Sequence, residues 1–268
     1  MIRALLAMLL LVGCTGTDIN DSARYLDMPE ALEEISGLAM ASANSVFAHD
    51  DEVGAIHEIS IEDGRVLRTF VIGNPVVEDD IEGIAARGDQ LWVINSEGVI
   101  RAFTAGRHRT RVLHRQYDTG VGEYCEVEGL SLSPQTDHLL IACKNMHEGD
   151  RRGTLFIYQW NTKTQEAVDE PWRQIGLGMA LREERSDFAP SAIEWLPDYG
   201  QILVLSARGR SMLVLDETGQ ILARHRLNVM SHPQAEGVTV VGSNRLVIAD
   251  EGQQGGPGQL AIYPWPLS

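Results

Sequence analysis

The sequence has little positive charge, few cysteines and no long apolar run, and each absence narrows what the protein can be. It contains 22 lysines and arginines against 38 aspartates and glutamates, a formal net charge of −16. Such a chain repels phosphate backbones, so we expect no nucleic-acid partner. The apolar run at residues 4–12 is about half of the ~20 residues that a membrane-spanning helix needs.

The sequence also lacks the short motifs of common catalytic sites. No GxSxG nucleophile elbow, HExxH zinc motif or phosphate-cradling loop occurs. Residues 252–258 (GQQGGPG) are rich in glycine, but they lack the Lys-Ser/Thr pair and a following helical pattern. We interpret them as a loop between strands.

The N-terminus has the layout of a lipoprotein signal peptide. Arg3 precedes the apolar run, and residues 11–14 (LVGC) match the bacterial lipobox, in which the cysteine is acylated. The alternative is an ordinary signal peptide with a chance cysteine. We expect residues 1–13 to be removed and residues 14–24 to form a lipid anchor and tether, with lipid on Cys14. The next residue is threonine and not aspartate, which favours an outer-membrane location in the cell envelope over retention in the inner membrane.

Five similar motifs recur at intervals of about 45 residues, with one longer interval before the fourth. They are EISGLA (34–39), DIEGIA (80–85), EVEGLS (126–131), PSAIEW (190–195) and QAEGVT (234–239). Each is followed by two further strand patterns separated by polar turns, and most repeats have a fourth, at residues 65–72, 110–117 and 220–227. Four antiparallel strands per ~45 residues is typical of a propeller blade. We therefore predict an all-β, five-bladed β-propeller over residues 25–268.

The fifth repeat ends after its third strand, which would leave an open sheet edge. Residues 20–28 can supply the missing strand, so we predict that they pair with residues 258–264 and close the propeller. The longer interval holds a charged insertion, residues 165–188, which is too short for a sixth blade. We interpret it as an excursion after an outer strand.

Blade geometry brings the start of each first strand and the end of each second strand to one mouth of the central channel. Glu82, Glu128 and Glu236 precede motif glycines, and three carboxylates around one axis need a cation or basic neighbours. Oxygen ligands favour Ca²⁺ over zinc or copper. The alternative is that backbone N–H groups, with Lys144 and Arg208, compensate the glutamates. The residues expected to line this mouth as a binding site are Ser36, His49, Asp50, Glu97, Lys144, Ser191, Arg208, His232, Asp250 and Glu251.

Histidine and cysteine give two further expectations. His49 and His232 would be the bases of any catalysis at this mouth, but a rim histidine is more often a polar surface group. Cys125 lies just before the third motif, and Cys143 ends the partner strand. Export makes an oxidised pair reasonable, so we predict a disulfide between them.

The motifs together resemble the SdiA-regulated (YjiK-like) family and, more distantly, propellers with NHL-type or phytase-like repeats. The matching stretches cover about residues 33–252 and include EISGLA, DIEGIA, CEVEGLSLSP, LLIACK, ILVLSARGRSMLVLDETGQI and QAEGVTVVGSNRLVIADE. The resemblance implies a five-bladed, envelope-associated propeller with bound calcium and no settled activity. It carries a ligand role only to Glu82, Glu128 and Glu236, because Ser191 stands where the fourth repeat would need a glutamate.

Three functions stay open at this point. The first is a non-enzymatic, calcium-binding module that presents the channel mouth to a small ligand or an envelope protein. The second is a calcium-dependent hydrolase of esters, lactones or phosphoesters, in which the cation would activate a bound water. The third is a structural scaffold in an outer-membrane assembly. The absence of a nucleophile motif favours the first, so enzymatic activity is not the leading expectation.

Overall fold

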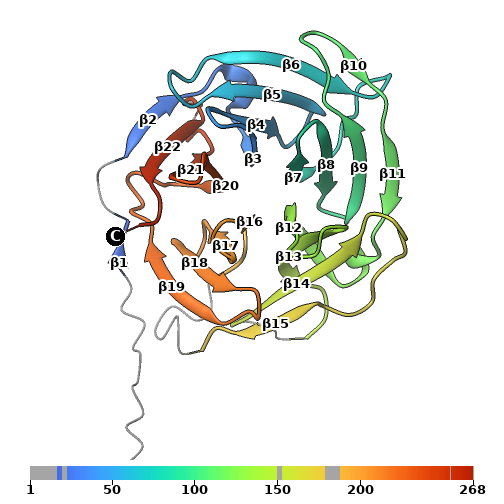
Figure 1. Ribbon diagram of the computed structural model, residues 1–268, viewed down its shortest axis with the longest axis vertical. Coiled ribbons are helices and arrows are strands. Elements are labelled where there is room, and N and C mark those ends of the chain that lie inside the picture. The colour runs from blue at the N-terminus through green and yellow to red at the C-terminus, as the bar shows by residue number, and fades with distance from the viewer. Residues whose placement is uncertain (1–16, 20–22, 150–152, 179–187, 254, 268) are drawn as a thin grey trace, which may run out of the picture.

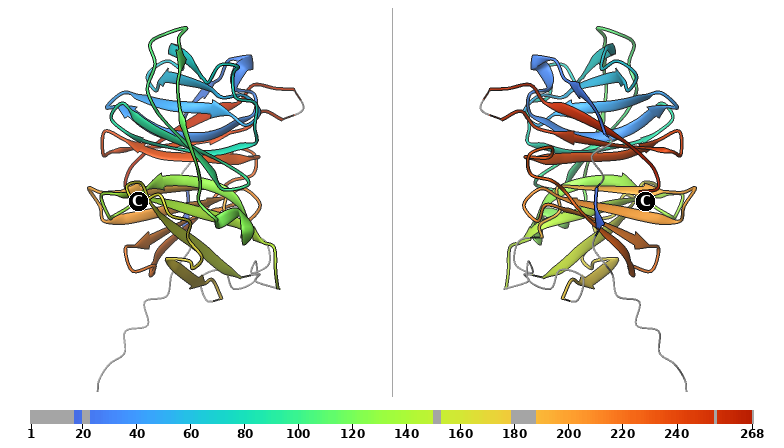
Figure 2. Two further views of the ribbon diagram at one scale, coloured as in Figure 1. Left: turned by 90° about the vertical axis from the view of Figure 1, so that its right-hand side faces the viewer. Right: turned by 90° about the vertical axis from the view of Figure 1, so that its left-hand side faces the viewer.

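The computed structural model describes residues 17–19, 23–149, 153–178, 188–253 and 255–267. Cys14, the signal peptide and most of the expected tether lie outside these ranges. Five antiparallel sheets surround a central axis like the blades of a propeller (Figure 1), which confirms the predicted fold class. Figure 2 turns the molecule by 90° and shows the strands running between the two faces of the disc.

Each blade is a meander that begins at the channel and ends at the outside. Blade 1 contains β3 (Ile35–Ser42), β4 (Ser45–Asp50), β5 (Ala55–Ser60) and β6 (Val66–Ile72). Blade 2 contains β7 (Ile81–Arg87), β8 (Gln90–Asn95), β9 (Val99–Thr104) and β11 (Arg115–Asp118). Blade 3 contains β12 (Cys125–Leu132), β13 (His138–Met146), β14 (Thr154–Asn161) and β15 (Arg173–Gly176).

Blades 4 and 5 complete the ring. Blade 4 contains β16 (Ala192–Leu196), β17 (Gln201–Ser206), β18 (Ser211–Asp216) and β19 (Ile221–Arg226). Blade 5 contains β20 (Ala235–Val241), β21 (Arg245–Asp250) and β22 (Gln259–Pro264), with β2 (Arg24–Asp27) as its outer strand. Two short 3-10 turns, η1 (Glu30–Leu32) and η2 (Val121–Glu123), precede β3 and β12.

The predicted closure is confirmed. Strand β2 pairs antiparallel with β22, with Tyr25 opposite Ala261. The chain before β2 also contributes a short strand that was not predicted: β1 (Thr17–Asp18) pairs parallel with β19 of blade 4. The N-terminal segment therefore ties the last two blades together.

Two strand assignments need correction. Residues 110–117 do not form one outer strand: β10 (Arg111–Val112) pairs parallel with β6 of blade 1, and only β11 completes blade 2. The insertion at residues 165–188 was interpreted as an excursion after an outer strand, but it contains the outer strand of blade 3, β15. Both short strands lie at blade edges, where few buried contacts mark a strand in the sequence.

The core lies between the blades. Five clusters of buried apolar side chains each fill the space between two neighbouring blades. Strand β13 shows the reason for its continuous apolar run: Leu139 and Ile141 face blade 2, while Leu140 and Ala142 face blade 4. A strand that is covered on both faces needs apolar side chains at every position. Within the described ranges, no helix combines the length and the apolar character needed to cross a membrane.

Candidate functional site at the channel mouth

The residue before the motif glycine is bulged in four of the five inner strands. In β3, β7, β12 and β20 the pairing register skips one residue, and the skipped residues are Ser36, Glu82, Glu128 and Glu236. A β-bulge leaves its extra residue unpaired and redirects its side chain. The bulges therefore bring these four side chains to the channel mouth. Strand β16 has no such shift, in line with its divergent motif.

The motif glycines permit close packing of the inner strands. A Cβ on Gly83 would lie 2.6 Å from the Leu130 backbone nitrogen of the next blade. A Cβ on Gly129 would lie 3.1 Å from the Ile193 nitrogen. Side chains at these positions would push the blades apart at the axis, so the glycines are needed for the narrow channel.

Glu82, Glu128 and Glu236 gather around the axis and influence one another. Burial, followed by the neighbouring carboxylates, raises the pKa of Glu82 to about 9 and that of Glu236 to about 8. Burial also raises the pKa of Glu128 to about 7. The Ser36 hydroxyl donates a hydrogen bond to Glu82 Oε2 at 3.3 Å. Ser36, Glu82 and Glu236 border a void of only about 10 Å³, room for a single water.

Lys144 provides a positive charge inside this ring. Its ammonium group is hydrogen-bonded to Glu128 and lies 3.6 Å from Glu126. It also lowers the pKa of Glu82 and Glu236, against the stronger effect of burial. Lys144 thus serves as the counter-charge that was the alternative to a metal. Arg208, the other expected counter-charge, is exposed on the turn after β17.

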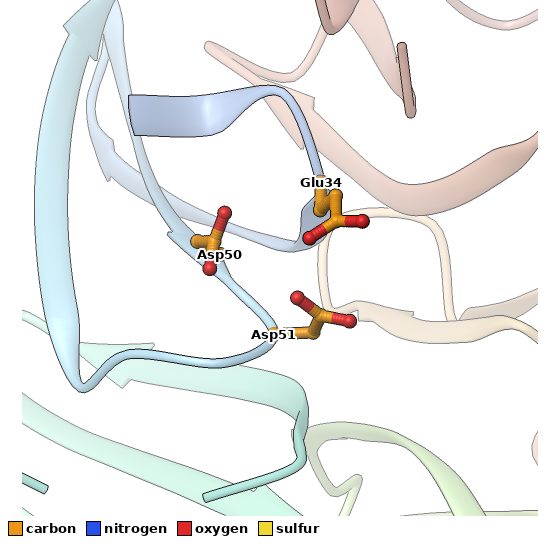
Figure 3. Close-up of side chains that lie close together, drawn as sticks. All are labelled: Glu34, Asp50 and Asp51. Atoms are coloured by element: carbon orange, nitrogen blue, oxygen red, sulfur yellow. The ribbon is translucent and has the colours of Figure 1, made fainter. Parts of the chain in front are cut away.

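The densest carboxylate group lies beside the ring. Among the described residues, Glu34, Asp50 and Asp51 form a set in which one carboxylate oxygen of each lies within 4.8 Å of those of the other two. Figure 3 shows the three carboxylates turned toward one another at the start of β3 and the end of β4. Binding of a metal by Glu82, Glu128 and Glu236 stays a prediction. The carboxylates that lie closest together are those of Glu34, Asp50 and Asp51.

Asp51 is the unsatisfied member of this group. Its Oδ1 is buried and has no hydrogen-bond partner. Burial, then the charges of Asp50 and Glu34, raises the pKa of Asp51 to about 6. Burial raises the pKa of Glu251 to about 7, with Asp51 and Glu34 as the next causes. Glu251 therefore connects this group to the axial ring.

Of these residues, Asp50 and Glu251 were predicted to line the binding site at the mouth, whereas no ligand role was assigned to Glu34 or Asp51. The signal was present: Glu34 opens the first motif, and two consecutive aspartates end the following strand. Among repeats two to five, only the fifth has an acidic pair at the end of its second strand, Asp250-Glu251, and its motif starts with the uncharged Gln234.

The two histidines do not fit the predicted role of catalytic bases at the mouth. His49 is 0% exposed, and burial lowers the pKa of its imidazole to about 4. His232 is 3% exposed, with its ring nitrogens 2.7 Å from Asp250 Oδ2 and 2.6 Å from the Tyr263 hydroxyl. Both imidazoles are enclosed by the blades that carry them, so neither reaches a substrate at the rim. Asp250 is likewise a buried partner of His232 and not a surface ligand.

The remaining predicted mouth residues have simpler surroundings. The Ser191 hydroxyl donates to the Ala235 carbonyl at 2.6 Å and so links blades 4 and 5. Glu97 is exposed on the turn between β8 and β9. Cys125 and Cys143 form a disulfide that joins β12 to β13, with a Cα–Cα distance of 5.7 Å.

The fold and this mouth define a five-bladed β-propeller with a carboxylate-lined channel opening. A family model described as phytase-like, "Esterase-like activity of phytase", matches residues 20–221, and the chain belongs to this family. No curated protein matches the chain at a significant level. The resemblance to the SdiA-regulated family stays a prediction.

Solved structures share the fold at low sequence identity. The Myxococcus xanthus glutaminyl cyclase is 14% identical, with a TM-score of 0.58 over 90% of this chain and 94% of that one. A luciferin-regenerating enzyme is 10% identical, with a TM-score of 0.57 over 92% and 97%. The WD40 repeats of RRP9 are 10% identical, with a TM-score of 0.54 over 94% and 99%. At such identities these likenesses support the propeller fold alone.

Proposed function

We propose that the protein binds a divalent cation at Glu34, Asp50 and Asp51 and uses it to recognise a ligand at the channel mouth. The observation that carries this proposal is the buried, unpartnered Asp51 Oδ1 within a set of three converging carboxylates. A buried carboxylate oxygen without a donor is costly, and a cation is the partner that would relieve it.

The donor set fits Ca²⁺. It offers only carboxylate oxygens, which hard cations prefer, and it has no nitrogen or sulfur ligand to favour zinc. No lysine or arginine in the described part of the chain forms an ion pair with these three carboxylates. Glu34 is exposed, so the site is open to solvent on one side. Water or a ligand oxygen can complete the coordination there.

Calorimetric titration of chelator-treated protein with CaCl₂ tests this proposal. We expect one binding event in the wild type, and Asp51→Asn should weaken it at least about tenfold because it removes one charged ligand. Glu52→Gln is the matched control: it removes an exposed neighbouring charge that is not a ligand in the set. Equal calcium affinity in wild type and Asp51→Asn, or no binding heat at all, contradicts the assignment.

A second candidate function is hydrolysis of an ester or phosphoester, and the family match favours it. A bound divalent cation can polarise the ester oxygen and lower the pKa of a water. Because His49 and His232 are buried, the catalytic base would be one of the carboxylates at the mouth. Glu251, with a pKa of about 7, can take up and release a proton near neutral pH.

Chromogenic acetate, butyrate and phosphate esters of p-nitrophenol, assayed with CaCl₂ or with chelator, test the hydrolase. We expect turnover that requires calcium and falls about a hundredfold in Glu251→Gln. Glu97→Gln is the control, since Glu97 is exposed on the same rim. If no ester turns over above buffer in calcium, the protein is a binding module and not an enzyme.

We also propose that the propeller is held in the cell envelope by lipid on Cys14. The lipobox at residues 11–14 supports this location, and the Cys125–Cys143 disulfide fits an oxidising compartment. Labelling with an alkynyl fatty acid should mark the wild type and not Cys14→Ser, which should fractionate as soluble protein. Label retained in Cys14→Ser would contradict a lipid at this residue.

A further inference from the structure

A second cavity lies at the opposite mouth of the channel. Its volume is about 320 Å³, and its wall includes residues from the far ends of all five inner strands: Met40, Ala86, Leu132, Trp195 and Val240. The glutamate ring borders the other ends of the same strands. The void of about 10 Å³ bordered by Ser36, Glu82 and Glu236 belongs to that other end.

The cavity is mostly apolar and holds one fixed carboxyl group. Glu194 of β16 accepts hydrogen bonds from the Ser131 hydroxyl at 2.9 Å and the Thr239 hydroxyl at 2.8 Å. Ser131 Oγ in turn accepts a hydrogen bond from the backbone N–H of Trp195 at 2.8 Å. These hydroxyls come from blades 3 and 5, so both neighbours of blade 4 hold the carboxyl group in place.

This carboxyl group has no positive partner in the described part of the chain. No lysine, arginine or histidine lines the cavity, and no ion pair to Glu194 is formed there. Burial raises the pKa of Glu194 to about 7, although two hydroxyl donors lower it. The other ionisable side chains of the wall are Asp198 and Tyr199. Asp198 accepts a hydrogen bond from the Ser243 hydroxyl, and the Tyr199 hydroxyl donates to the Ser243 carbonyl.

We propose that this cavity binds a small apolar amine, whose ammonium group pairs with Glu194 while its hydrocarbon part packs against Met40, Leu132 and Trp195. The volume lies at the lower end of the ~300–1,000 Å³ range of small-molecule sites, and an apolar wall with one charged anchor is their usual composition. Charge decides the ligand class. An anion would face Glu194 and Asp198, and a neutral apolar molecule would leave the carboxylate unpaired.

Three matched probes test the proposal by calorimetry: n-hexylamine, hexan-1-ol and hexanoate, which share one alkyl chain and differ in the head group. At pH 8.5 we expect hexylamine to bind, hexanol to bind at least about tenfold more weakly, and hexanoate not to bind. Hexylamine affinity should fall from pH 8.5 to pH 6, because Glu194 takes up a proton while the amine stays charged. Equal affinities of amine and alcohol, or no amine binding, would overturn the proposal.

Two variants and a control locate the binding. Glu194→Gln keeps the shape of the side chain, with an oxygen that accepts from one hydroxyl and an amide N–H that can donate to the other. It should lower hexylamine affinity about tenfold while leaving hexanol within about twofold. Glu97→Gln, which removes the same charge at the opposite mouth, should change neither. Met40 is 48% exposed, so Met40→Trp can fill the cavity without disturbing the core, and it should weaken amine and alcohol together. If Glu194→Gln does not fold, Met40→Trp alone tests the site. Unchanged hexylamine binding in either variant would show that the amine binds elsewhere and would refute the proposal.

Discussion

At the scale of single residues, Lys144 carries more of the mouth's charge balance than any other side chain described there. Its ammonium group contacts Glu128, which is only 3% exposed, and lies near Glu126. The carboxylates of Glu82, Glu236 and Glu251 are also affected by its charge. Because Lys144 lies among the axial glutamates, their negative charge is partly neutralised by the protein itself and does not depend on a metal alone.

Lys144→Met should destabilise the protein by about 2–3 kcal/mol at pH 8, because it leaves the buried Glu128 charge without its partner. The loss should shrink at pH 5, where Glu128, with a pKa of about 7, is neutral. Urea unfolding at both pH values measures it. Lys163→Met is the control: its ion pair with Asp137 is exposed, so removal should cost less than about 1 kcal/mol. Similar losses for both lysines would show that Lys144 has no special role.

At the scale of strands, the bulges explain both what the sequence predicted and what it did not. The repeat of Xaa-Gly predicted that Ser36, Glu82, Glu128 and Glu236 share a mouth, since repetition alone puts equivalent residues at equivalent places. It did not predict the register shift that aims them inward, because a bulge is set by pairing with the second strand. The edge strands β1 and β15 were not predicted, and β10 was predicted as one strand with β11, because short segments at a sheet edge have too few buried residues to show a period.

The close approach of inner strands makes Gly83→Ala strongly unfavourable. Its Cβ would lie 2.6 Å from the Leu130 backbone nitrogen, which cannot move without shifting blade 3. We expect a loss of about 2–3 kcal/mol in the free energy of unfolding, measured by chemical denaturation. Gly176→Ala in β15 is the matched control, because its Cβ would meet no atom within 4 Å. A loss of equal size in both variants would show that the effect of Gly83→Ala comes from the lost backbone freedom of glycine and not from packing at the axis.

The disulfide acts on the same inner hairpin. Cys125 and Cys143 are 18 residues apart and both are buried between blades 2 and 3. By the chain-entropy estimate, a bridge over a loop of this size contributes about 3 kcal/mol. Cys125→Ala/Cys143→Ala should therefore lower the unfolding free energy by about that amount, and a reducing agent should no longer affect the midpoint. A midpoint equal to that of the oxidised wild type would mean that the bridge adds no stability.

At the scale of the whole molecule, the propeller has one acidic mouth and one apolar mouth. The positions of Glu82, Glu128 and Glu236 could be predicted because these residues stand in the repeat motifs, whereas the cavity around Glu194 could not. Its wall is assembled from residues such as Ala86, Leu132 and Val240, which look like ordinary strand interior in the sequence. Only their meeting at the end of the channel makes them a site.

The acidic mouth also sets how stability changes with pH. Glu82, Glu128, Glu236 and Glu251 have pKa values of about 9, 7, 8 and 7 in the folded protein, all above the ~4.3 of an unfolded glutamate. Between these values the folded state binds more protons than the unfolded state, so stability falls as pH rises. The stability from these protons is fully present only below about pH 4 and is lost progressively up to about pH 9.

Chelator-treated protein should therefore have a lower melting temperature at pH 8.5 than at pH 5.5, by several degrees. Calcium should offset this loss, because its proposed ligand Asp51, with a pKa of about 6, is mostly ionised at pH 8.5 and mostly protonated at pH 5.5. Calcium should therefore stabilise the protein more at pH 8.5 than at pH 5.5. Scanning calorimetry at both pH values, with and without CaCl₂, measures both effects. The CaCl₂ concentration should be on the order of millimolar, so that it exceeds the Kd of a weak, solvent-exposed calcium site. MgCl₂ at equal ionic strength controls for screening. A calcium shift that is larger at pH 5.5, or equal to that of magnesium, would mean that Glu34, Asp50 and Asp51 do not form the cation site.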